Sequence, residues 1–86
     1  MTTTHPKKPV YRDREKVEPG SKAAISYAVA ESLRAAANNC NEDAEKYSDN
    51  GYALYAAKCH QAAALYNTAA ERVEQAAYLL IEVKEL

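Results

Sequence analysis

The sequence predicts an all-α protein, a long antiparallel helical hairpin with an N-terminal arm. Three observations support this fold class: alanine recurs at every seventh residue in both halves, a parallel heptad column of mostly larger residues accompanies it, and a turn signal separates the halves. A seven-residue apolar repeat is typical of helices that pack lengthwise against each other. The chain of 86 residues has no Phe or Trp and relies on small alanines, so its core is thin. We therefore expect the hairpins to assemble into a helical bundle, as a dimer or higher oligomer, or to bind a partner tightly.

Residues 1–20 are expected to form a basic, proline-containing arm, and residues 21–86 the helical hairpin. Pro6, Pro9, Pro19 and Gly20 interrupt the arm, and its charged residues show no helical period.

The first helix is predicted over residues 22–49. Ser21 follows the Pro-Gly break and is a good N-cap. The heptad alanines are Ala23, Ala30, Ala37 and Ala44, and the larger column is Ser26, Leu33, Cys40 and Tyr47. Asn38, Asn39 and Asn41 are poor helix formers, which leaves open a kink or break at this point.

A turn is predicted over residues 49–51, because Gly51 suits the left-handed position that ends a helix. The second helix is predicted over residues 52–84, a length of about 50 Å. Its alanine column is Ala56, Ala63, Ala70 and Ala77, and its larger column is Tyr52, Cys59, Tyr66, Val73 and Leu80.

Folding the chain back at this turn brings residues whose numbers add to 99 opposite each other. Cys40 then lies opposite Cys59, and the first three alanines lie opposite Ala76, Ala69 and Ala62. The facing cysteines allow two interpretations. In the first, they form a disulfide or a thiol switch. In the second, they stay reduced and fill space in the contact between the helices. The expected distance between the helix axes makes disulfide geometry marginal.

No metal, cofactor or catalytic activity is expected. A structural zinc site needs four ligands, and His60 is expected to point to solvent. Phosphate-binding loops are rich in glycine, and the chain has two glycines. We interpret Glu71, Glu74 and Glu82 as ordinary charges on a helix surface.

The apolar residues that the helix contact leaves unused gather at the open end of the hairpin. These are Ile25, Tyr27, Tyr78, Leu79, Ile81 and Leu86. Because that end is too apolar to face water, we expect the N-terminal arm, a second copy of the chain or another protein to cover it. Our preferred interpretation is a contact surface for another protein. The second choice is the turn end, where Tyr47, Tyr52 and Tyr55 serve either as core residues or as a contact surface.

Two alternative functions remain open. Tyr11, Arg12, Arg14 and Lys22 combine an aromatic ring with cations, which allows an oligomeric sponge to bind an anionic, cyclic nucleotide. A structural or redox-controlled scaffold would instead use Cys40 and Cys59. The net charge of −1 does not favour general nucleic-acid binding. No apolar run approaches a membrane span and no signal peptide is present, so a cytoplasmic location is expected.

In size and layout, a short basic arm before a long helical hairpin, the chain resembles some small phage-encoded anti-defence proteins. These include inhibitors of bacterial immune nucleases and helical sponges for cyclic nucleotides. The resemblance implies a non-catalytic inhibitor that occupies the surface of a macromolecular partner. No motif matches residue by residue, so no functional residue is carried over from it.

Overall fold

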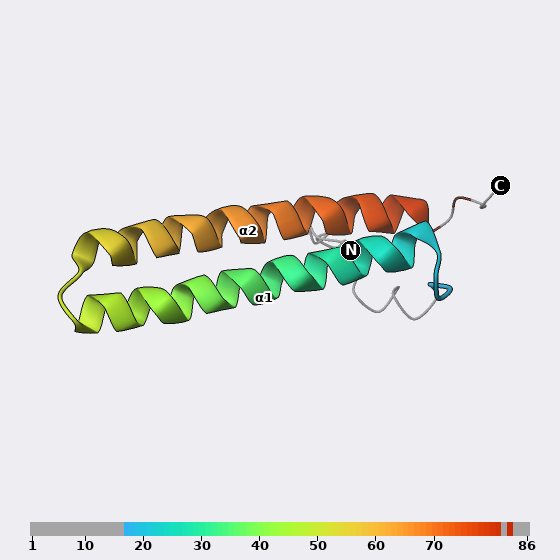
Figure 1. Cartoon of the computed structure of the whole chain (residues 1–86). Helices are drawn as coiled ribbons and strands as arrows, with labels where there is room; N and C mark the ends of the chain where they lie inside the picture. The colour runs from blue at the N-terminus through green and yellow to red at the C-terminus, as the bar shows by residue number, and fades with distance from the viewer. Residues whose placement is uncertain (1–16, 82, 84–86) are drawn as a thin grey trace, which may run out of the picture.

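Two antiparallel helices of equal length form the hairpin (Figure 1). The computed structural model describes residues 17–81 and 83. Helix α1 spans Lys22–Asp49 and helix α2 spans Ala53–Leu80, each of 28 residues. No strand occurs among the described residues. The predicted all-α helical hairpin is therefore confirmed.

Both ends of α1 are held by the caps that the sequence suggests. The Ser21 hydroxyl accepts a hydrogen bond from the Ala24 amide at 3.2 Å. At the other end Gly51 has a φ of 85°, its amide donates to the Ser48 carbonyl at 3.0 Å, and the Tyr52 amide donates to the Tyr47 carbonyl at 2.8 Å. This is a Schellman motif, which satisfies the last carbonyls of the helix and needs the left-handed residue.

Helix α1 runs without a break through Asn38–Asn41. The flanking residues Ala37 and Ala44 are fully buried against the partner helix. Since most helical stability in proteins comes from packing, this contact overrides the weak helix propensity of the asparagines.

Helix α2 ends at Leu80, four residues before the predicted end at residue 84. Weaker i→i−3 bonds follow, from the amides of Ile81 and Val83 to the carbonyls of Tyr78 and Leu80. The two helices have equal lengths, so α1 offers no further residues on which α2 could pack beyond this point.

The core lies along the line where the helices touch, which we call the seam. Its buried apolar residues are Tyr27 and eight alanines, Ala23, Ala30, Ala37, Ala44, Ala56, Ala63, Ala70 and Ala77. The predicted facing positions on α2 were wrong by one residue, because Ala62 and Ala69 are half-buried and Ala76 is exposed. The buried alanines of the two helices have numbers that add to 100, in place of the predicted 99.

Candidate functional site: an apolar face beside the seam

Contacts across the seam distinguish two sides of the hairpin. On one side the Tyr47 ring meets the Tyr55 ring with centroids 5.4 Å apart. On the other side Arg34 pairs with Glu74, and Asn41 lies 2.9 Å from His60. Aromatic rings therefore join the helices on one side, and charged and polar groups join them on the other.

Helical spacing extends the aromatic side along the whole hairpin. Five turns of an α-helix take 18 residues, so a residue 18 positions away points in the same direction. Val29 thus shares the direction of Tyr47, and Val73 shares that of Tyr55. Residues at intermediate helical spacings complete a surface that we call the apolar face: Val29, Leu33, Cys40 and Tyr47 on α1, with Tyr55, Cys59, Tyr66, Val73 and Leu80 on α2.

The apolar face is incompletely covered within one chain. Leu33, Cys40, Cys59, Val73 and Leu80 are half-buried. Val29 and Tyr66 remain 45% and 40% exposed. Ala36, Ala62 and Ala69, also half-buried, lie between or beside these residues. The largest side chains near the seam therefore lie beside the buried alanines and remain available to a further surface.

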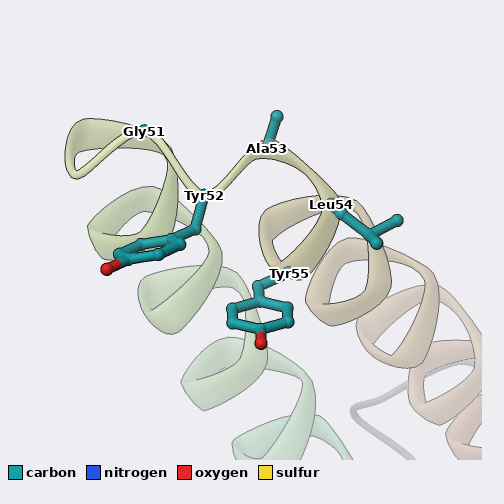
Figure 2. Close-up of a pocket in the computed structure, with 5 residues that line it drawn as sticks. All are labelled: Gly51, Tyr52, Ala53, Leu54 and Tyr55. Carbon is teal, nitrogen blue, oxygen red and sulfur yellow. The ribbon is translucent and has the colours of Figure 1, made fainter.

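Three tyrosines gather where the apolar face meets the turn. Tyr52 and Tyr55 stack with ring centroids 5.7 Å apart, and Tyr47 stands edge-on to both rings. Figure 2 shows the rings of Tyr52 and Tyr55 on the same side of the chain, whereas Ala53 and Leu54 point elsewhere. All three rings are exposed, from 39% to 56%, so they are a surface cluster rather than core residues.

Open hollows adjoin this tyrosine cluster. Residues Gly51–Tyr55 line one of about 350 Å³, shown in Figure 2. A second hollow of about 230 Å³ is lined by Tyr47, Tyr55, Lys58 and Cys59, and it continues from the turn onto the apolar face. The turn end and the apolar face thus form one continuous surface.

The opposite side, which we call the polar face, includes Arg34, Asn41, His60, Asn67 and Glu74. Arg34 donates from Nη2 to Glu74 Oε1 at 2.6 Å and from Nε to Oε2 at 3.2 Å. Glu74 is 4% exposed, so its interpretation as an ordinary surface charge was wrong. The signal was its position: Glu74 follows Ala70 by four residues and precedes Ala77 by three, which places it at the seam.

His60 is exposed, but it does not point away from the hairpin as expected. Its Nδ1 lies within hydrogen-bond distance of Asn41 Oδ1 on the other helix. The imidazole therefore bridges α1 and α2 across the polar face.

The predicted open-end surface does not form one patch. Tyr27 is 2% exposed and belongs to the core, so its assignment to a contact surface was wrong. It lies four residues after Ala23 and three before Ala30, which turns it into the seam.

The other predicted open-end residues are spread around the hairpin. Tyr78 lies four residues after Glu74, on the side of the polar face, and is 41% exposed. Leu79 is 71% exposed and lies two residues after buried Ala77, so it points about 200° away from the seam. Ile25 is exposed beyond the edge of the apolar face, Ile81 is half-buried, and Leu86 lies outside the described residues.

Cys40 and Cys59 are both free and half-buried on the apolar face. Within the part of the chain that the structure describes, no three His, Cys, Asp or Glu side chains group as metal ligands. Of the predicted nucleotide-binding cluster, Tyr11, Arg12 and Arg14 lie outside the described residues. Lys22, the fourth member, is exposed at the start of α1.

Neither α1 nor α2 contains an apolar stretch long enough to cross a membrane. The described residues form an all-α helical hairpin with a partly exposed apolar face beside the seam. No family model, curated protein or solved structure matches the chain. Its function must therefore be argued from its own residues.

Proposed function

We propose that the chain is a non-catalytic binding protein and that the apolar face, together with the turn-end tyrosines, is its contact surface. The observation that carries this proposal is the segregation of side chains around the seam. Large alkyl and aromatic groups line one side, and the charged pair and the polar bridge lie on the other. A continuous apolar surface that one chain leaves partly exposed is typical of an interaction site.

The composition of the face suits binding better than chemistry. Its tyrosines combine a large apolar ring with a hydroxyl that stays hydrated at the rim, a property enriched at interface hot spots. Occupation of a partner's surface is also the mode of action expected of an inhibitor, including the phage anti-defence proteins that the chain resembles in layout.

Site-specific photo-crosslinking tests this proposal in cells that express the chain. A benzophenone amino acid replaces Tyr66 on the apolar face, and the matched control carries it at the next residue, Asn67. Asn67 lies seven residues from both His60 and Glu74, so it belongs to the polar face. The proposal predicts protein adducts from position 66 and few from position 67. Equal yields from both positions, or none from position 66, would contradict it.

A further inference from the structure

The core of one hairpin is too small to account for a stable chain by itself. Eight of its nine buried apolar residues are alanines. An alanine side chain is a single methyl group, so its burial contributes little to stability. Small domains with so little buried surface need a disulfide, a metal or association. Both cysteines are free and no metal-ligand group is present among the described residues, which leaves association as the remaining source of stability.

The repeat of the apolar face specifies what kind of surface can cover it. Leu33, Cys40 and Tyr47 recur every seven residues on α1. On α2 the same spacing separates the four members Cys59, Tyr66, Val73 and Leu80. Side chains at this spacing pack between those of other helices that carry the same repeat. A second copy of the chain supplies two such helices, and a two-fold axis makes the surface complementary to itself.

Charge and area agree with pairing between copies. None of the nine residues of the apolar face is Asp, Glu, Lys or Arg, so two copies meet without repulsion between like charges. A helix of 28 residues is about 42 Å long and about 10 Å wide, so a face of two helices covers about 800 Å². That is about the area that each partner contributes to a standard stable interface.

We infer that the partner of the apolar face is a second copy of this chain, and that two hairpins form a four-helix bundle. This inference rests on the proposed function, because it names the occupant of the same surface. In the dimer the half-buried residues of the face become core, and the Arg34–Glu74 pair and the His60–Asn41 bridge remain on the outer sides.

Sedimentation equilibrium of the full chain tests the inference. The wild type is expected at twice the chain mass of 9.5 kDa. Tyr66→Glu places a charge on the face and is expected to weaken dimerisation at least 100-fold. Asn67→Glu, the same change one residue away on the polar face, is expected to leave the dimer intact. A wild type of any mass other than the dimer, or a Tyr66→Glu variant that pairs as tightly as Asn67→Glu, would overturn the inference.

A second measurement covers the case in which Tyr66→Glu unfolds. The melting temperature of a dimer that unfolds on dissociation rises with protein concentration, because mass action favours the associated state. We expect the wild type to show this rise over a 100-fold range of concentration, and a constant melting temperature would overturn the inference. A folded monomer that still gives adducts of other masses from position 66 would overturn self-pairing alone. Absence of any adduct from that position would overturn the proposed function as well.

Discussion

Removing the guanidinium of Arg34 should destabilise the hairpin more than any other single change on the polar face. Arg34→Met keeps the length of the side chain but removes both hydrogen bonds from Arg34 to the Glu74 carboxylate. The Glu74 side chain is only 6% exposed, so water cannot easily replace these bonds. Breaking a buried ion pair costs about 3–5 kcal/mol. Because the Arg34 side chain is 32% exposed, solvent already screens part of the interaction, so we expect a loss of about 2–3 kcal/mol.

Urea unfolding followed by circular dichroism measures this loss, at one fixed protein concentration. For a chain of this size the denaturant slope is about 1 kcal/mol per molar urea, so the midpoint should fall by about 2–3 M. Arg72→Met is the matched control, because Arg72 is exposed on α2, and it should change stability by less than about 0.5 kcal/mol.

A double variant distinguishes two effects: the loss of the Arg34–Glu74 interaction, and the cost of leaving the Glu74 charge buried without Arg34. Arg34→Met with Glu74→Leu removes both ions, and an apolar pair of similar volume is often neutral or stabilising. The double variant should therefore recover most of the stability that Arg34→Met loses. If Arg34→Met behaves like Arg72→Met, or the double variant is no more stable than Arg34→Met, the pair does not have the role assigned to it.

Substitutions at three further positions probe the local structure. Gly51→Ala forces a side chain into a backbone with a φ of 85° and should cost about 1 kcal/mol, measured by urea unfolding. Ser21→Ala removes the cap on the Ala24 amide and should also cost about 1 kcal/mol, whereas Ser21→Asp should retain the wild-type midpoint. Ala70→Leu places a larger side chain at a fully buried seam position and should lower stability by about 1–3 kcal/mol; a neutral effect would show that the helices are not in close contact there.

Much of the hairpin could be predicted because its repeat is regular. Every alanine of the two predicted columns is buried, and the turn residue Gly51 takes the expected left-handed conformation. The choice between neighbours such as Ala62 and Ala63 could not be made, because both recur every seven residues and the spacing alone does not say which one faces α1. The end of α2 was placed too late, because the repeat continues in sequence where the packing partner has ended.

The candidate site was harder to predict because side-chain type was weighed before helical position. Tyr27 and Glu74 each lie between two buried alanines, at spacings of three and four residues, which places both beside the seam. His60 has the same spacing and is exposed, so spacing alone does not show which of these side chains are buried. The apolar face was present in the predicted heptad columns, but those columns were interpreted as the contact between α1 and α2. Alanines alone make most of that contact, so the larger residues are left for another surface.

If another surface covers the apolar face, that surface should protect the thiol of Cys59 from alkylation. Cys59 lies on that face and is half-buried within one chain. The comparison is a variant with Cys40→Ala, Cys59→Ala and Asn67→Cys, whose single thiol lies on the polar face. Residue 67 is also half-buried within one chain. In the purified full chain at high concentration, we predict that an alkylating reagent modifies Cys59 at least tenfold more slowly than the thiol at position 67. Equal rates of modification would show that the apolar face is not covered.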